Sequence, residues 1–427
     1  MKAKNRKVKR MTAIFMAAAM SMTLLAGCGG KTLTEEELSF CQTDIGTLTA
    51  PDHVKIVGLG ESSHGASEYQ QMKAEVFKAL VKNNGCRTFV IEGDFGGGLK
   101  VDTYIHGGEG TAQEAVAELG FGIYRTKELA ELADWMRSYN AEAAEGRDLH
   151  FYGMDMQRYD NNKEYLFSVL DEAAPELSEE YKEIFSRLTD DNRYVLDNSA
   201  LEQAQTDALA LLKAMDEKEE EITAVSGKRD FAFARECANS IYESSELCAS
   251  GTDYNSLRDG HMAEKVVWFV SQGDGSLIFI NGHNGHIGKS SVSGYTCLGA
   301  RLTEAYGDGY FAIGTDAAAT RFNSQKDSGG FEVMEVKNKN DLNRQLDKLQ
   351  GDYYYLDFSE VSEDSGWQEI LNSSQKITSL NVGIAGWQKI SKMFYTQAVV
   401  PSADFDGMIV FREVSPTAIV EIGRAHV

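Results

Sequence analysis

The sequence predicts an α/β fold: a mostly parallel β-sheet flanked by helices, with a largely helical insertion or cap. In residues 51–160, short β-branched segments alternate with amphipathic helical ones. That order implies parallel strands joined by right-handed crossovers. Residues 161–270 are rich in Glu, Lys, Leu and Ala and show almost no strand pattern. Strand patterns return in residues 271–420, so we expect one α/β domain in two parts around the insertion.

Residues 1–27 have the pattern of a secretory signal peptide. The first ten positions carry six Lys or Arg and no acidic residue, and an apolar run follows that is too short to span a membrane. The run ends in Leu25-Ala26-Gly27-Cys28, which resembles a bacterial lipobox. The resemblance implies cleavage before Cys28, lipidation of its thiol with palmitate-like chains, and a lipoprotein on the extracytoplasmic face of the cell membrane. Residues 28–50 would then be a lipidated tether and N-terminal segment; the alternative is an ordinary signal peptide with an incidental cysteine.

The remaining elements follow from hydrophobic periodicity. Seven short β-branched or aromatic runs predict strands, at residues 53–59, 88–91, 149–152, 276–280, 310–313, 353–358 and 408–411. Apolar residues spaced three and four apart predict helices over residues 67–82 and 126–144.

Charge and cysteine content exclude several classes of function. The net charge is −23, and loss of the six positive charges of residues 1–27 lowers it to −29, a surface that repels nucleic acid and anionic membrane lipid. The five cysteines after Cys28 are scattered and form no CxxC pair, so neither a disulfide framework nor a four-cysteine zinc site is indicated. Cys86 and Cys297 lie in apolar stretches and are expected to fill the core. Residues 421–427 resemble the in-frame translation of a sequencing adapter and are expected to be an artefact.

Acidic and histidine side chains follow four of the predicted strands. Ligands of open parallel sheets bind outside the carboxyl ends of the strands, so side chains far apart in sequence are expected to converge there. In chain order these are Glu61 and His64, then Glu92, then Asp155, and finally His283 and His286.

These residue types suit hydrolysis, because a histidine can take a proton from water and a carboxylate can orient that histidine. Other chemistries remain open. A metal-dependent hydrolase could use His64, His283 and His286, although the chain has H-x-x-H and no H-E-x-x-H. Ser62 or Ser63 could act as nucleophile, although no G-x-S-x-G elbow occurs. A solute-binding lipoprotein is the alternative outside catalysis.

Several short strings together resemble the erythromycin esterase family. They are GLGESSHGASEY at 58–69, FVIEGD at 89–94, YRT at 124–126, FYGMDMQ at 151–157, RD at 258–259 and NGHNGHI at 281–287. With FDG at 405–407, these strings extend in order over nearly the whole mature chain.

The resemblance implies a hydrolase without metal or cofactor that opens an ester or macrolide lactone by attack of an activated water. It implies that His64 is the general base, with Glu61 in the same turn, and that Glu92 and His283 are further catalytic groups. The expected substrate-binding residues are His286, Arg125, Asp155 and Arg258. The chain departs from the family at one position, where the Trp common in the helix-start motif is Tyr124; this position is expected to shape the pocket and so to bear on whether a macrolide is the substrate.

Overall fold

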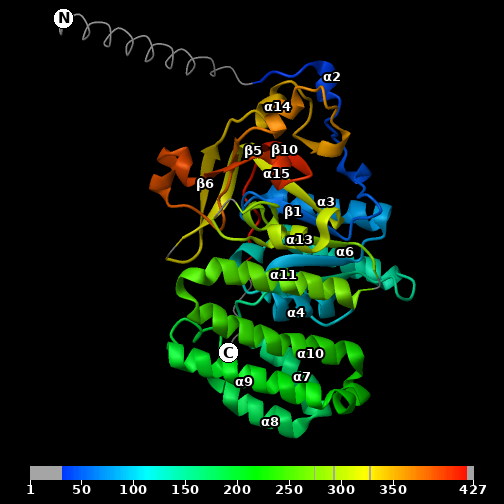
Figure 1. The fold of residues 1–427 in the computed structure, drawn as a ribbon, viewed down its shortest axis with the longest axis vertical. Coiled ribbons are helices and arrows are strands. Elements are labelled where there is room, and N and C mark those ends of the chain that lie inside the picture. Colours follow the sequence, from blue (N-terminus) through cyan, green and yellow to red (C-terminus); the bar gives the residue numbers. More distant parts are fainter. Residues whose placement is uncertain (1–30, 274, 292–293, 327, 421–427) are drawn as a thin grey trace, which may run out of the picture.

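The computed structural model describes residues 31–273, 275–291, 294–326 and 328–420 (Figure 1). The predicted signal peptide, the lipidation site Cys28 and the predicted adapter residues 421–427 lie outside the described residues. Among the residues that are described, no helix is both long and apolar enough to cross a membrane.

The centre of the fold is a sheet of eight strands. Its order is β3-β2-β4-β1-β5-β10-β7, and β6 pairs with β5 at one end. The pairs among β3, β2, β4, β1, β5 and β10 are parallel, whereas β7–β10 and β5–β6 are antiparallel. The bounds are β1 Ile56–Glu61, β2 Thr88–Asp94, β3 His150–Asp155, β4 Ile278–His283, β5 Tyr310–Gln325, β6 Phe331–Lys337, β7 Tyr353–Asp357 and β10 Gly407–Val414. The predicted α/β fold with a mostly parallel sheet is confirmed.

Side chains of the central strands are buried on both faces, as is usual for parallel sheets covered by helices. Ile56 of β1 and Ile280 of β4 belong to the hydrophobic core on one face. Their sequence neighbours Val57 and Phe279 belong to the hydrophobic core on the other face. This alternation follows from the period of two along a strand.

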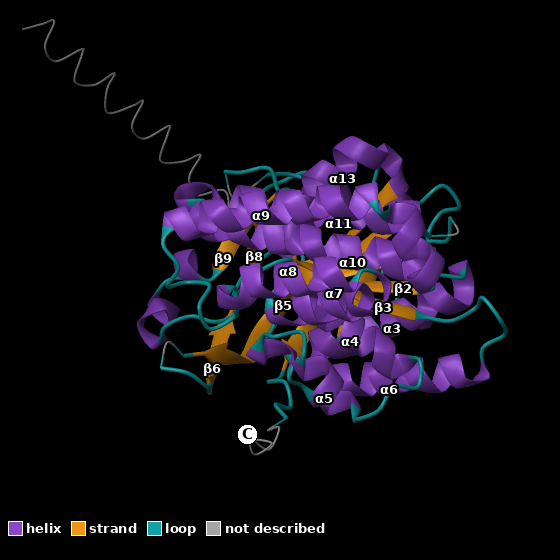
Figure 2. Ribbon diagram, turned by 90° about the horizontal axis from the view of Figure 1, so that it is seen from below, coloured by secondary structure: helices purple, strands orange, loops and turns teal. Residues whose placement is uncertain are grey.

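Helices cover both faces of the sheet (Figures 1 and 2). One core contains residues of α3 (Ser67–Asn84), α5 (Ala112–Ala117) and α6 (Lys127–Glu142), and α3 and α6 confirm the two predicted helices. The other core includes residues of α4 (Phe95–Ile105) and of the largely helical segment predicted for 161–270. That segment forms α7 Asp160–Ala173, α8 Pro175–Ile184, α9 Asn198–Glu217, α10 Glu219–Ala249 and α11 Tyr254–Gln272. Figure 1 shows them stacked below the sheet.

The strands that sequence patterns missed are more polar or shorter than those they found. β6 has buried Met334 and Val336 between exposed residues that include Glu332, Val333 and Glu335, as expected at an edge of the sheet. β8 (Gln375–Thr378) and β9 (Thr396–Val399) have four residues each and form a separate antiparallel pair. The remaining helices are short: α2 Glu35–Leu38, α12 Asn284–Ile287, α13 Leu298–Tyr306, α14 Trp367–Leu371 and α15 Pro401–Asp404.

The N-terminal segment is packed against the domain. Leu33 and Leu38 are buried, and the indole Nε1 of Trp367 donates to the carbonyl of Glu37 at 2.8 Å. The expected tether therefore gives way to folded structure by Leu33. Cys86 and Cys297 are buried and unpaired, which confirms them as core side chains.

Candidate active site

The carboxyl ends of β1, β2 and β4 border a cavity of about 450 Å³. Parallel pairing puts them side by side, and Glu61 at the end of β1 is in register with His283 at the end of β4. Five of the predicted site residues line the cavity: His64, Glu92, Arg258, His283 and His286. The predicted convergence of strand ends is therefore present in the structure.

His64 lies in the turn between β1 and α3, three residues after Glu61. Its Nδ1 is 2.7 Å from Oε1 of Glu61, so the two side chains are paired within this turn. The turn packs closely against β5 at Gly65, where an added Cβ would lie 2.1 Å from the carbonyl oxygen of Asn323. Glycine is therefore required beside the histidine.

Glu61 is buried and ionised. Burial alone would raise its pKa, but the Lys73 ammonium, 3.0 Å from Oε2, and His64 outweigh burial and lower that pKa. A carboxylate can only accept hydrogen bonds, so Nδ1 of His64 carries the hydrogen, and in the neutral imidazole Nε2 is the nitrogen with the lone pair. The geometry thus provides a histidine in the tautomer that a general base requires.

Glu92, at the end of β2, is held by two cations. Its Oε1 accepts from Arg258 at 2.8 Å and lies 3.2 Å from Nε2 of His286. Its Oε2 accepts from the backbone N–H of His283 at 2.8 Å. Burial alone would raise the pKa of Glu92, but His286 and Arg258 overcome this effect and hold it well below the usual range. The surrounding cations therefore favour the ionised form of Glu92, which accepts hydrogen bonds from its neighbours.

His286 is bound by carboxylates at both ring nitrogens. Besides the Glu92 contact, its Nδ1 lies 2.8 Å from Oδ1 of Asp259. Burial alone would lower the pKa of His286, but Glu92 and Asp259 outweigh burial and raise it to about 10. An imidazolium with both N–H groups engaged has no lone pair for a metal ion.

His283 is neutral and has one nitrogen without a partner. Its Nδ1 accepts from the backbone N–H of Gly285 at 3.1 Å, so Nε2 carries the hydrogen. Burial, together with repulsion from His64 and His286, lowers the pKa of His283 to about 3. Its Nε2 is buried with no hydrogen-bond partner in the described part of the chain. The ring centre lies 5.7 Å from that of His64, so the unused donor is next to the candidate base.

The hydroxyl groups of both serines in this turn are engaged in hydrogen bonds with the backbone. Ser62 Oγ donates to the carbonyl oxygen of Thr315 at 2.6 Å, and Ser63 Oγ accepts from the backbone N–H of Gly65 at 3.2 Å. Both side chains are buried, and neither is among the residues found lining the cavity.

Two predicted substrate-binding residues do not line the cavity. Asp155, at the end of β3, is fully buried and binds Arg258 at 2.6 Å, so it supports a cavity residue from behind. The Arg125 side chain is exposed outside the lining. Its neighbour Tyr124 lines the cavity instead and donates to the backbone carbonyl of Glu92 at 2.6 Å. The YRT string therefore does contribute a side chain to the cavity. The sequence does not show which of its first two residues points inward.

Lys73 was missed by sequence reasoning although a signal was present. It lies on the apolar stripe of α3 formed by Tyr69, Val76, Phe77 and Leu80, where a lysine is unexpected. Lysine is almost never fully buried unless it is paired. A lysine at that position therefore indicates a buried acid, which the structure identifies as Glu61.

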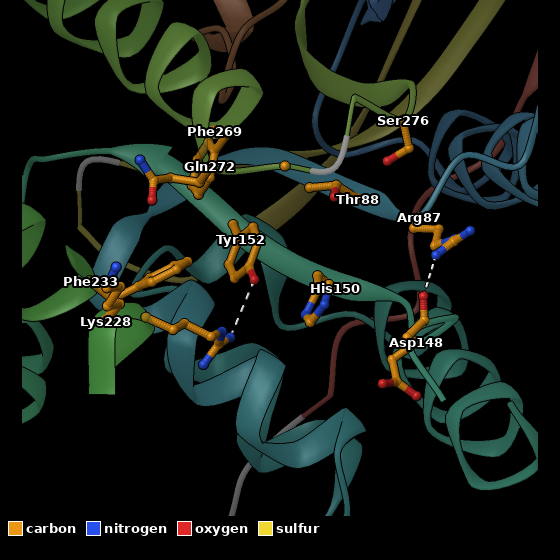
Figure 3. A pocket seen from close by; sticks show the side chains of 13 residues that line it. Arg87, Thr88, Asp148, His150, Tyr152, Lys228, Phe233, Phe269, Gln272 and Ser276 are labelled. Atoms are coloured by element: carbon orange, nitrogen blue, oxygen red, sulfur yellow. Dashed lines mark hydrogen bonds between the residues drawn. The ribbon is translucent and has the colours of Figure 1, made fainter. Parts of the chain in front are cut away.

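A second cavity, of about 390 Å³, lies at the opposite ends of β2 and β3 (Figure 3). It is bordered by Thr88 and His150, which are the first residues of these strands, and by the rings of Tyr152, Phe233 and Phe269. Nearby, Asp102, His106 and His150 form one of two clusters in the described chain with the spacing of metal ligands; the other is Glu243, His261 and Glu264. Neither cluster includes His64, His283 or His286.

Comparisons with known proteins agree with the fold and the motifs. The sequence profile described as erythromycin esterase matches residues 81–414. An Escherichia coli protein named erythromycin esterase type II is 26% identical over 303 residues, which cover 61% of this chain and 68% of that protein.

Solved structures are similar over most of the chain. A Bacillus cereus protein, 25% identical, superposes with a TM-score of 0.74 and covers 86% of this chain and 91% of its own. A mutant of erythromycin esterase EreC in its open conformation is 16% identical, with a TM-score of 0.60 over 87% of this chain and 93% of its own. The second likeness is one of fold.

Proposed function

Because the chain belongs to the erythromycin esterase family, we propose that it is a hydrolase that opens an ester or macrolide lactone by general-base activation of water. One observation carries the proposal. His64, oriented by ionised Glu61, and His283, with an unused Nε2–H, belong to the same cavity.

The proposed reaction begins with a water molecule beside Nε2 of His64. His64 takes a proton from this water as the oxygen attacks the carbonyl carbon of the substrate, and Glu61 stabilises the imidazolium that forms. The carbonyl π bond breaks, and its electron pair becomes a negative charge on oxygen. The oxyanion electron pair then re-forms the carbonyl as the C–O bond to the alcohol breaks, and His64 returns the proton to the leaving oxygen.

His283 is suited to stabilise the negative charge. A neutral imidazole that already holds its hydrogen on Nε2 can donate a hydrogen bond to an oxyanion without moving a proton. Because its pKa is lowered to about 3, it stays in this form across the neutral range. Glu92, Arg258 and His286 keep the wall around it in place through the contacts described above.

The test is an assay of purified protein against a panel of macrolides and simple esters, read as a mass gain of one water. His64→Asn should reduce turnover by at least ~10²-fold, as expected for loss of a positioned base, and thermal melting should show that the fold is kept. Ser63→Ala is the matched control from the same turn and should retain turnover, because water is the nucleophile.

If Ser63→Ala lost turnover while His64→Asn kept it, this mechanism would be overturned. Absence of turnover for every substrate, with measurable ligand binding, would favour the solute-binding alternative. Glu92→Gln should also reduce turnover, because the amide no longer balances Arg258 and His286.

We also propose that the enzyme is anchored to the extracytoplasmic face of the cell membrane through lipid on Cys28. The Leu-Ala-Gly-Cys string at the end of the apolar run supports this proposal. Two acyl chains on one thiol-linked glyceride anchor a protein stably, whereas one chain holds it only weakly.

A further inference from the structure

The loop between β8 and β9, residues 379–395, exposes an unusual number of apolar side chains. We refer to it as the β8–β9 loop. Thirteen large hydrophobic residues are exposed in the described part of the chain, and five of them lie in this one loop. They are Val382, Trp387, Ile390, Met393 and Phe394, with exposed fractions of 45%, 61%, 88%, 73% and 37%.

The loop is also basic in an acidic protein. The chain has 65 Asp and Glu residues and a net charge of −23. Residues 370–403 contain none of these acids and include Lys376, Lys389 and Lys392. Both lysines of the loop are exposed, beside Trp387 and Met393.

The stem of the loop is fixed to the body of the protein. The backbone N–H of Leu380 donates to the carbonyl of Ser62 at 2.9 Å, and that of Gln325 donates to the carbonyl of Val382 at 3.0 Å. Tyr395 is buried at the other end. The tip protrudes beside β6, at the left of Figure 1 in dark orange. The exposed side chains are therefore presented by an anchored loop.

We propose that the β8–β9 loop docks on an anionic lipid bilayer. Trp, Ile, Met and Phe side chains next to lysines are typical of segments that insert shallowly into the headgroup region, with lysine ammoniums at the phosphates. The acidic remainder of the chain is repelled by such a surface, so the loop is the part that faces it. A second copy paired loop to loop would bring Lys389 and Lys392 against like charges, whereas an anionic bilayer offers acyl chains to the apolar side chains and phosphates to the lysines.

Docking by this loop holds the cavity next to the bilayer. Ser379, Asn381 and Val382 at the start of the loop line the cavity, and the backbone N–H of His64 donates to the carbonyl of Asn381 at 3.4 Å. This inference does not depend on the proposed reaction or on the anchor at Cys28, although it agrees with a protein held at a membrane.

The test uses the chain from residue 29 on, so that no acyl chain contributes to binding. The described hydrophobic core begins at Leu33 and is retained. Binding is measured by co-sedimentation with vesicles of equal parts phosphatidylglycerol and phosphatidylcholine at low salt. The wild-type chain should bind, and binding should weaken as salt is added because the lysine contribution is screened.

Two loop variants separate the apolar and the electrostatic contributions. Ile390→Ser with Met393→Ser should reduce the partition coefficient at least ~10-fold, since both side chains lose their burial in lipid. Lys389→Glu with Lys392→Glu should reduce it by more than ~20-fold, from about fivefold for each positive charge lost. The matched controls, Leu209→Ser with Val225→Ser and Lys127→Glu with Lys213→Glu, change exposed residues elsewhere and should bind as wild type.

Fluorescence locates the contact. Trp387 is one of four tryptophans, so brominated lipid should quench the wild-type chain more than Trp387→Phe, which should still bind. Failure of the wild-type chain to bind, or equal binding by the loop variants, would overturn the proposal. A dimer in sedimentation velocity that the Ile390/Met393 variant loses, without vesicle binding, would overturn it in favour of a second copy of the chain.

Discussion

At the scale of single residues, the site is a set of buried ion pairs beside the two histidines His64 and His283. Lys73 balances Glu61, and Arg258 and His286 balance Glu92. A buried ion that loses its partner is costly, so each member keeps its neighbours in a fixed protonation state. Nε2 of His283 has no hydrogen-bond partner among the described residues and can donate to a ligand.

Lys73 should set the pH range in which the base works. Lys73→Met removes the cation that lowers the pKa of Glu61, so burial then raises that pKa and protonates the carboxylate at higher pH. The acid limb of the pH profile of kcat/KM should move upward by about one unit or more, the shift expected for one close charge. Lys73→Arg keeps the charge and should restore the wild-type limb; an unshifted limb in Lys73→Met would contradict this positioning role.

His286 should make stability depend on alkaline pH. Its pKa rises from 6.5 to about 10 in the folded state. A raised folded-state pKa contributes stability that is complete below pH 6.5 and is lost as pH rises toward 10. The difference in unfolding free energy between wild type and His286→Gln should therefore shrink across this range in urea titrations. A difference that stays constant from pH 6.5 to 10 would show that His286 is not a buried cation.

At the scale of elements, glycines let α4 pack closely against β3. A Cβ on Gly98 in α4 would lie 2.1 Å from the backbone nitrogen of Gly153 in β3. Any side chain there would separate the helix from the strand that presents Asp155. The run of three glycines at the start of α4 is thus required by packing, although glycine lowers helix propensity.

Two glycine substitutions in helices should therefore have opposite effects. Gly98→Ala should destabilise the protein by about 2 kcal/mol or more, as expected for overpacking. Gly260→Ala in α11 meets no atom closer than 3.5 Å and should stabilise by about 0.5–1 kcal/mol, because alanine restricts the unfolded chain. Chemical denaturation of both variants gives the comparison, and equal signs would refute the close contact at Gly98.

At the scale of the whole molecule, parallel pairing gathers the site. The strands that carry Glu61, Glu92 and His283 are widely separated in sequence and adjacent in the order β2-β4-β1. The helical segment contributes Arg258 from α11. The cavity therefore includes residues of the helical segment as well as residues that follow the strands of the sheet.

Chelation should leave the proposed activity unchanged. Both ring nitrogens of His286 contact carboxylates, and Nδ1 of His283 accepts from a backbone N–H. Together with His64, these histidines therefore do not present a tetrahedral set of lone pairs to a metal ion. Turnover after prolonged dialysis against a chelator should equal that of untreated enzyme. Loss of turnover that zinc or manganese restores would assign the protein to metal-dependent hydrolases.

Cys28→Ala should separate the protein from the membrane or leave it unprocessed. The variant loses the thiol to which lipid would attach, and the β8–β9 loop by itself should give only salt-sensitive binding. Cell fractionation followed by a high-salt wash distinguishes the two contributions. A variant that is processed and salt-resistant like wild type would contradict lipidation.

The sequence by itself determined the α/β class, seven of the strands and the identity of five residues of the cavity. Strand and helix periods are local properties, and parallel strands bring their carboxyl ends to one edge whatever the order of strands. Erythromycin esterase motifs at those ends made the family recognisable before any contact was known.

Only the tertiary structure decided which partner each charged residue has. That Lys73 reaches Glu61, that Asp155 stands behind Arg258, and that Tyr124 and not Arg125 enters the cavity depend on side-chain direction and on packing between distant segments. The protonation states follow from the same contacts, because burial and neighbouring charges set them. Under the proposed mechanism these contacts favour His283 as the donor and His64 as the base, which residue type alone leaves undecided.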